Sequence, residues 1–198
     1  MDSVDPIETW VDAARAGGDW AFARLWERLS PSVAGYLRTR GVADSEDVTS
    51  EVFLAAFQGI GTFKGDAANF RSWLFTIAHH RAVDSLRRET KRRHDVSYDP
   101  VSDSRGTASA EDTAMSADRA AETGALLNLL TAEQRDVLSL RFVADLSLDE
   151  VSTVTGRSVD AVKQLQRRGI AALRRHLDGS TSASPIPLHA VESMTETR

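Results

Sequence analysis

The signals that start and stop helices near the C-terminal end constrain the fold more than any other feature of the sequence. The run SLDE at 147–150 is a capping box, in which a serine hydroxyl and a glutamate carboxylate satisfy free backbone N–H groups at a helix start. Gly156 follows about two turns later, where a helix ends favourably on glycine, and Ser158 can cap a second helix. Two helices joined by so tight a turn predict a helix-turn-helix.

The helix expected after Ser158 has an apolar side and a basic side. Val159, Val162, Leu165, Gly169 and Leu173 recur at spacings of three and four, which places them on the apolar side. From position 157 to 175 there are six Lys or Arg residues against one acid. A comb of Arg, Lys and Gln suits the edges of bases in a DNA major groove. A solvated charged face is the alternative, and the position in a helix-turn-helix favours DNA. The outward residues are Lys163, Gln164, Arg167 and Arg168.

The remaining ordered parts of the sequence are also predicted to be helical. In the first block, apolar residues recur at helical spacing from Asp19 to Gly41, and Pro31 is expected to kink or restart that helix. Another helix is expected to begin at Asp44. A glycine-rich loop is expected over 59–69. In the second block, the run TAEQ at 131–134 is another capping box. The fold class is therefore all-α.

A basic and aromatic segment follows the glycine-rich loop. Residues 71–93 hold seven Lys or Arg residues against two acids, although the whole chain has a formal charge of −5. Phe70, Trp73 and Phe75 interleave with these cations, as is typical of proteins that stack single-stranded bases on aromatic faces. The alternative is that the rings belong to the core. We expect a core role for Phe75, while both interpretations stay open for Trp73.

Between the two helical blocks the composition changes. Residues 95–122 contain seven acids, two arginines and few large apolar side chains, so this segment is expected to be a flexible linker. We predict two small helical domains, at 7–94 and 123–178, joined by that acidic linker. The polar segment 179–198 is expected to be a disordered tail.

Four acids gather at the head of the helix that begins after Asp44. They are Asp44, Glu46, Asp47 and Glu51. Complementarity to the helix dipole is enough to explain them. An acidic face in a nucleic-acid binder cannot itself face phosphate, however, so it is also free for a protein partner.

The sequence offers no arrangement that suggests catalysis. His79 and His80 diverge around a helix without a third metal ligand at a suitable spacing, and the chain has no cysteine. We therefore expect no cofactor, no metal site and no enzymatic activity. The sequence has no apolar run long enough to span a bilayer and no secretion signal at its start, which favours a cytoplasmic protein.

Three blocks, in this order, resemble one known family. They are DSEDVTSEVFLAAF, FKGDAANFRSWLFTIAHHRAVDSLRR and LTAEQRDVLSLRFVADLSLDEVSTVTGRSVDAVKQLQRRGIAALRRHL. Over about residues 7–177 the chain resembles the bacterial extracytoplasmic-function sigma factors. The resemblance implies a subunit that binds core RNA polymerase, reads the −35 and −10 promoter elements and promotes strand opening.

The resemblance also implies roles for individual residues. Contact with the clamp helices of the largest polymerase subunit is implied for Asp44, Glu46, Asp47, Glu51 and Phe53. Recognition of the −10 element is implied for Phe63, Lys64, Asn69, Phe70, Arg71, Trp73, His80, Arg81, Asp84, Arg87 and Arg88. Recognition of the −35 element is implied for Arg157, Ser158, Lys163, Gln164, Arg167 and Arg168.

The family further implies a set of partners. They are core RNA polymerase, including the flap of its second-largest subunit, promoter DNA and an anti-sigma factor, without direct membrane contact by this chain. Two rival functions stay open: a stand-alone helix-turn-helix regulator and an enzyme acting on nucleic acid. The acidic helix beside an aromatic loop is the feature that a stand-alone regulator does not need.

Overall fold

The protein is described by a computed structural model over residues 6–95, 126–127 and 129–181. Every regular element in this described part is a helix, which confirms the all-α fold class. The predicted linker lies outside the described residues except for Asp95, and so does the predicted tail from residue 182 onward. Residues 179–181 of that tail continue the last helix.

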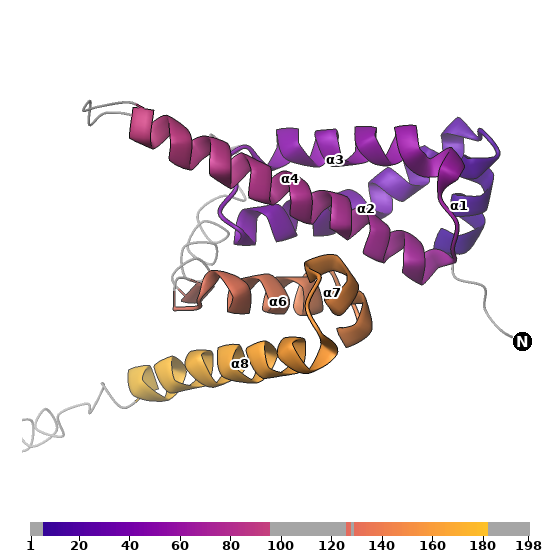
Figure 1. Ribbon diagram of the computed structural model, residues 1–198. Coiled ribbons are helices and arrows are strands. Elements are labelled where there is room, and N and C mark those ends of the chain that lie inside the picture. Colours follow the sequence, from indigo (N-terminus) through magenta and orange to yellow (C-terminus); the bar gives the residue numbers. More distant parts are fainter. Residues whose placement is uncertain (1–5, 96–125, 128, 182–198) are drawn as a thin grey trace, which may run out of the picture.

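The helices form two groups along the chain (Figure 1). The first group consists of α1 (Pro6–Arg15), α2 (Asp19–Thr39), α3 (Ser45–Gly59), the short 3₁₀ helix η1 (Ile60–Thr62) and α4 (Ala67–Asp95). The second consists of α6 (Ala132–Phe142), α7 (Leu148–Thr155) and α8 (Val159–Thr181).

In the first group, α1 packs against α2, α2 against α3, and α3 against α4. The largest side chains between them are fully buried, among them Tyr36, Phe53, Phe70 and Phe75. The burial of Phe75 confirms its predicted core role. The burial of Phe53 and Phe70 bears on the predicted binding sites, as described below.

Helix α2 passes through Pro31 as a single helix, so the proline does not restart it. The helix ends as predicted at Gly41, whose φ of +85° is a left-handed conformation that favours glycine. The N–H of Gly41 donates to the carbonyl of Arg38, and the N–H of Val42 donates to that of Leu37. This pair of bonds is a Schellman motif, which satisfies carbonyls left free at the helix end.

The predicted loop over 59–69 is shorter than expected. Residues 60–62 form η1, and α4 already begins at Ala67. The Oδ1 atom of Asp66 accepts the backbone N–H of Asn69 at 2.8 Å, which caps the start of α4. The aspartate was the available signal for this helix start, and its position inside a glycine-rich run obscured it.

The second group has the predicted helix-turn-helix geometry. Both capping boxes are present, at 131–134 and 147–150. Gly156 closes α7 with a φ of +66°, and the Ser158 hydroxyl accepts the N–H of Ala161 at 3.3 Å. A Cβ added at Gly169 would lie 2.8 Å from Leu138 of α6, so glycine allows α8 to pack closely there.

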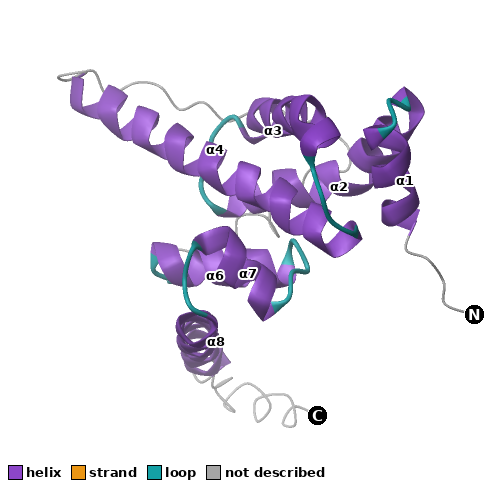
Figure 2. Cartoon of the chain, turned by 45° about the vertical axis from the view of Figure 1, so that its right-hand side comes forward, coloured by secondary structure: helices purple, strands orange, loops and turns teal. Residues whose placement is uncertain are grey.

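The two groups are in direct contact. Helix α4 packs against α7 and α2 packs against α6. Figure 2 shows α6 and α7 lying beside α4, with α8 on the far side of α6. Buried apolar residues from both groups belong to one continuous cluster.

Candidate nucleic-acid interface

Helix α8 carries the row of exposed basic and polar side chains that its sequence predicts. Lys163, Gln164, Arg167 and Arg168 are all exposed, while Val162 on the opposite side is fully buried. Packing of α8 on α6 and α7 fixes which side faces outward. The arrangement provides four long hydrogen-bonding side chains on a rigid helix, as a major-groove reader requires.

The tight turn before α8 adds two exposed residues to this face. Arg157 and Ser158 both lie at the start of the helix. The N-terminal end of a helix carries free N–H groups and a partial positive charge, which favour a phosphate. All six residues predicted for the −35 element therefore lie together at one accessible end of α7–α8.

The residues predicted for the −10 element divide among three environments. The first is an aromatic cluster under the loop before α4. Phe63 and Trp73 stack with ring centroids 5.1 Å apart, and Phe70 lies 5.6 Å from Phe63 and 5.7 Å from Trp73. Trp73 is partly buried and Phe63 is 9% exposed, but Phe70 is 0% exposed. Phe70 is therefore a core residue that supports the other two rings, and in this conformation it does not offer a face to a base.

The second environment is the exposed surface beside that cluster and along α4. Lys64, Asn69, His80, Asp84, Arg87 and Arg88 are all exposed there. Asn69 also bonds through its side chain to Asp66 at 2.8 Å, which holds it at the head of α4.

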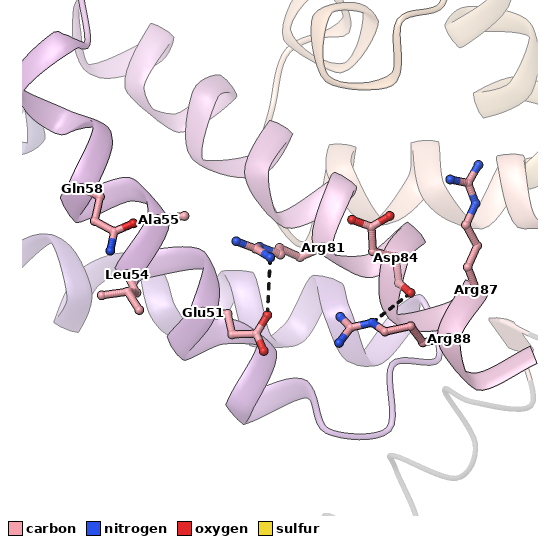
Figure 3. Close-up of a pocket in the computed structure, with 8 residues that line it drawn as sticks. All are labelled: Glu51, Leu54, Ala55, Gln58, Arg81, Asp84, Arg87 and Arg88. Atoms are coloured by element: carbon pink, nitrogen blue, oxygen red, sulfur yellow. Dashed lines mark hydrogen bonds and ion pairs between the residues drawn. The ribbon is translucent and has the colours of Figure 1, made fainter. Parts of the chain in front are cut away.

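Three of the α4 arginines line a groove of about 620 Å³ between α3 and α4 (Figure 3). Arg81 points across the groove to Glu51 on α3, with Nη1 3.8 Å from Oε2. The Nε of Arg88 donates to the backbone carbonyl of Asp84 at 3.3 Å. The groove thus joins a residue predicted for polymerase binding to residues predicted for DNA.

The third environment is the contact between the two helix groups, which holds Arg71. Its Nη2 donates to the carbonyl of Ala144 at 2.6 Å and to that of Asp145 at 3.1 Å. The carboxylate of Asp145 lies 3.7 Å away. In this conformation Arg71 is occupied by the second group and is not free for DNA.

The acidic head of α3 is exposed at Asp44, Glu46, Asp47 and Glu51. Glu46 and Asp47 line a groove of about 470 Å³ with Trp26 of α2, whereas Glu51 lies in the groove beside α4. Phe53 is 2% exposed and contacts Trp26 and Phe22 edge-on, so it belongs to the core and not to a contact surface.

A polar cluster between the two groups was not anticipated from the sequence. The carboxylate of Asp136 on α6 accepts a hydrogen bond from the Tyr36 hydroxyl at 2.7 Å. It also lies 3.3 Å from Arg40 Nη1 and 3.4 Å from His79 Nδ1. Tyr36 and Asp136 are 100 residues apart, and neither stands in a recognisable motif.

Burial raises the pKa of both acids in this cluster, but hydrogen bonding lowers the pKa of Asp136 and raises that of Tyr36. Burial alone raises the pKa of Asp136, but hydrogen bonding by His79, the charge of Arg40 and the Tyr36 hydroxyl together hold that pKa below its usual value. Burial and the neighbouring Asp136 carboxylate raise the pKa of the Tyr36 hydroxyl well above its usual value. The cluster therefore favours an ionised Asp136 and a neutral Tyr36.

Within the described ranges there is no group of three His, Cys, Asp or Glu side chains that could hold a metal ion. None of the helices described here combines the length and the apolar character that a membrane span demands.

Comparison with known families finds matches in both helix groups. The family model described as Sigma-70 region 2 matches residues 25–92, and the model described as Sigma-70, region 4 matches residues 126–175. The ECF RNA polymerase sigma factor BldN of Streptomyces coelicolor is 33% identical over 178 residues, which are 89% of this chain and 67% of BldN. The ECF RNA polymerase sigma factor SigK of Mycobacterium bovis is 30% identical over 174 residues, which are 83% of this chain and 90% of SigK.

Two solved structures share the helical architecture. CnrH, in complex with the cytosolic domain of CnrY, superposes with a TM-score of 0.67 at 25% identity, covering 88% of this chain and 99% of CnrH. The sigma factor RpoE of Bartonella quintana, in complex with the anti-sigma factor NepR, gives a TM-score of 0.60 at 20% identity, covering 79% and 96% of the two chains. The second likeness concerns the fold alone.

Proposed function

The chain belongs to the extracytoplasmic-function (ECF) RNA polymerase sigma factors, and we propose a division of the promoter-recognition work among its exposed faces. It is a specificity subunit of RNA polymerase, in which regions 2 and 4 bind the polymerase and the −10 and −35 promoter elements. Region 2 corresponds to the first helix group and region 4 to the second. We propose that the subunit has no catalytic residues of its own and acts in the cytoplasm, where the polymerase and the chromosome are.

The −35 element is read by α8. The observation that carries this assignment is the exposed comb of Lys163, Gln164, Arg167 and Arg168 on the second helix of a helix-turn-helix. Arg167 or Arg168 can bond bidentately to guanine, and Gln164 to adenine. Arg157 and Ser158 contact a phosphate at the start of the helix.

The −10 element is captured by the loop before α4 and by α4 itself. The partly buried Trp73, stacked on Phe63, offers a pre-ordered ring on which an unpaired base can stack. Lys64 and Asn69 stand exposed at the same loop, and His80, Arg81, Asp84, Arg87 and Arg88 follow the duplex edge along α4. Phe70 supports the rings from beneath, and Arg71 joins the interface when region 4 is displaced from it.

Core polymerase binds the surface formed by α2 and α3. Glu46 and Asp47 there border Trp26, and Phe57 beside it is 49% exposed. An apolar patch edged by carboxylates suits a protein partner with basic and apolar side chains. The CnrH structure is a complex with the cytosolic domain of CnrY, and we propose that this chain is likewise controlled by a protein partner, an anti-sigma factor.

Reconstitution with core RNA polymerase tests this proposal. The full chain is expected to form a stable complex that transcribes a specific subset of fragments from the genomic DNA of its own organism. Asp47→Lys should weaken the complex at least tenfold. Asp12→Lys on α1, an exposed acid outside the proposed surface, should not. A chain that binds duplex DNA tightly and specifically but never binds polymerase would instead be a stand-alone regulator.

A further inference from the structure

The loop before α4 places a polar side chain next to two stacked rings. Asn69 and Trp73 are four residues apart on α4, so they lie on the same face of the helix, one turn from each other. Trp73 stacks on Phe63, with ring centroids 5.1 Å apart. Asn69 is exposed and Trp73 is partly buried. Asn69 therefore borders the ring on which we place the unpaired base.

The position of the Asn69 side chain is fixed by close packing against Gly65. A Cβ added at Gly65 would lie 2.6 Å from the Cβ of Asn69 and 3.0 Å from the Cζ of Phe63. Gly65 also has a φ of +152°, which favours glycine. Asn69 and the Phe63 ring thus flank the same point beside Gly65, and a larger residue there would displace them.

The direction of the Asn69 amide is fixed by Asp66. The Oδ1 atom of Asp66 accepts both the backbone N–H and the side-chain Nδ2–H of Asn69, each at 2.8 Å. These bonds, first the one from the backbone and then the one from the side chain, lower the pKa of Asp66, so its carboxyl group is ionised near neutral pH. An ionised carboxylate accepts hydrogen bonds and donates none. The amide of Asn69 therefore turns its nitrogen toward Asp66 and its oxygen away.

An amide oxygen that is directed away from its own partner distinguishes between bases. Among the described residues, no side chain donates a hydrogen bond to the Oδ1 of Asn69. Adenine and cytosine carry an amino donor, N6 and N4, where guanine and thymine carry a carbonyl oxygen, O6 and O4. The amide oxygen attracts the amino group and repels the carbonyl oxygen.

We propose that Asp66 is a positioning residue that sets the base preference of the −10 surface, because it directs the Oδ1 of Asn69 toward the captured base and so favours adenine or cytosine over guanine or thymine. Asp66 contacts no base itself and acts through Asn69. The family resemblance assigns Asn69 to the −10 element but gives Asp66 no role. The inference rests on the proposed function, since it concerns the base that region 2 captures.

Promoters that the holoenzyme transcribes provide the probe for this inference. A short duplex whose −10 non-template strand is left unpaired is made with each of the four bases at every unpaired position, and binding of the holoenzyme is measured by fluorescence anisotropy. At one position, adenine or cytosine should bind about fivefold more tightly than guanine or thymine, as one added hydrogen bond allows. Purine in place of adenine, or 2-pyrimidinone in place of cytosine, removes only the amino group and should lose the same factor.

Three variants separate orientation from mere presence of the side chain. Asp66→Ser keeps a good helix cap, but a hydroxyl both donates and accepts, so Asn69 can turn either way and the preference should fall to about twofold or less. Asn69→Leu removes the amide and should abolish the preference at the same position. The double variant Asp66→Asn with Asn69→Asp exchanges donor and acceptor, leaves an acceptor oxygen facing the base, and should restore the preference.

The matched control is Asp12→Ser, at an exposed acid on α1, which should leave the affinities for all four bases unchanged. A purely structural role of Asp66 would change binding to the four bases alike and leave their ratio intact. Circular dichroism identifies any unfolded variant, and the exchanged pair keeps the test decisive if Asp66→Ser unfolds.

Two kinds of failure are distinguishable in this experiment. A holoenzyme that opens promoters but shows no such position, or keeps the preference in folded Asp66→Ser, would overturn the inference alone. A chain that forms no complex with polymerase would refute the proposed function, and the inference with it.

Discussion

The two basic segments of the chain carry the same formal charge but use it differently. Residues 71–93 and residues 157–175 each have a surplus of five positive charges. On α8 the cations stand outward on one face of a helix whose other side is buried. On α4 the first turns are core, with Phe70, Leu74 and Phe75 at 0% exposure, and exposed arginines become frequent only later in the helix.

The difference follows from what each segment is proposed to bind. A duplex reader needs a rigid row of side chains in a groove, and one amphipathic helix provides it. Capture of an unpaired base needs a ring held at a fixed place with one face accessible, which requires other rings to hold it. The −35 surface can therefore be local in sequence, whereas the −10 surface depends on tertiary packing.

The largest effect that would sharpen this comparison is expected at Phe70. Phe70→Ala removes a fully buried ring and should reduce the free energy of unfolding by about 3–5 kcal/mol, measured by chemical denaturation. Phe142→Ala, at a ring that is 65% exposed, is the control and should change it by about 0.5 kcal/mol or less. A stable Phe70→Ala variant that cannot open promoters would return Phe70 to the base-capturing residues.

The next effect is expected at Asp136 and depends on pH. Because the pKa of this carboxyl is lowered in the folded protein, its contribution to stability is present above the ordinary value of 3.8 and is lost as the pH falls through the folded-state value. Asp136→Asn should reduce the free energy of unfolding near neutral pH by about 1.5–3 kcal/mol and flatten the acid limb of the stability curve. An acid limb identical to that of the wild type would show that the cluster contributes nothing.

Arg167 tests the local character of the −35 surface. Arg167→Ala should weaken binding of the holoenzyme to its promoter by about 1–3 kcal/mol and relax the preference at one base pair, measured on promoters varied at the −35 element. Arg174→Ala, at an exposed cation farther along α8, should weaken binding to all sequences alike. A base preference that Arg167→Ala leaves intact would assign this side chain to a phosphate.

Trp73 tests the dependence of the −10 surface on packing. Trp73→Ala should spare the closed promoter complex and impair strand opening by about 1–3 kcal/mol for each base that stacks on the ring. Permanganate reactivity of unpaired thymines measures the opening, and a premelted promoter should restore transcription. Loss of the folded domain would show that Trp73 serves only the core.

The smallest effect is expected at the Glu51–Arg81 pair. Both side chains are more than 40% exposed, so Glu51→Gln should change stability by at most about 0.5 kcal/mol. If Glu51 contacts polymerase instead, the same variant should weaken the complex with core polymerase. Fluorescence anisotropy of the labelled chain, titrated with core polymerase at two salt concentrations, separates these outcomes, because an exposed charge contact weakens in salt.

Features that depend on residues close together in the sequence were predicted correctly. The two capping boxes, the left-handed Gly156 and the outward face of α8 each depend on residues within a few positions of one another. The same kind of signal placed the end of α2 at Gly41. The fold class and the exposed basic face of α8 could therefore be predicted from the sequence, while the role of that face at the −35 element stays a proposal.

Features that depend on contacts between distant parts of the sequence were predicted poorly. Phe70 and Trp73 are three residues apart, so helical spacing turns both toward one side and cannot tell which is buried beneath Phe63. The family resemblance implies a polymerase contact for Phe53, but its ring is 2% exposed and packs edge-on against Trp26 and Phe22. The sequence around Asp136 contains no motif that marks this residue. Its carboxylate accepts a hydrogen bond from Tyr36 of α2, which lies 100 residues away in the sequence.

That separation of 100 residues between Tyr36 and Asp136 has a consequence for the evolution of the chain. The entropy lost on closing a long loop grows only logarithmically, so doubling its length changes the free energy of closure by only about 0.6 kcal/mol. The contacting surfaces, in contrast, are fixed by individual atoms at Arg71 and Asp136. Relatives of this chain can therefore gain or lose residues between the two regions at little thermodynamic penalty, while substitutions at the contact itself are expected to be coupled in pairs.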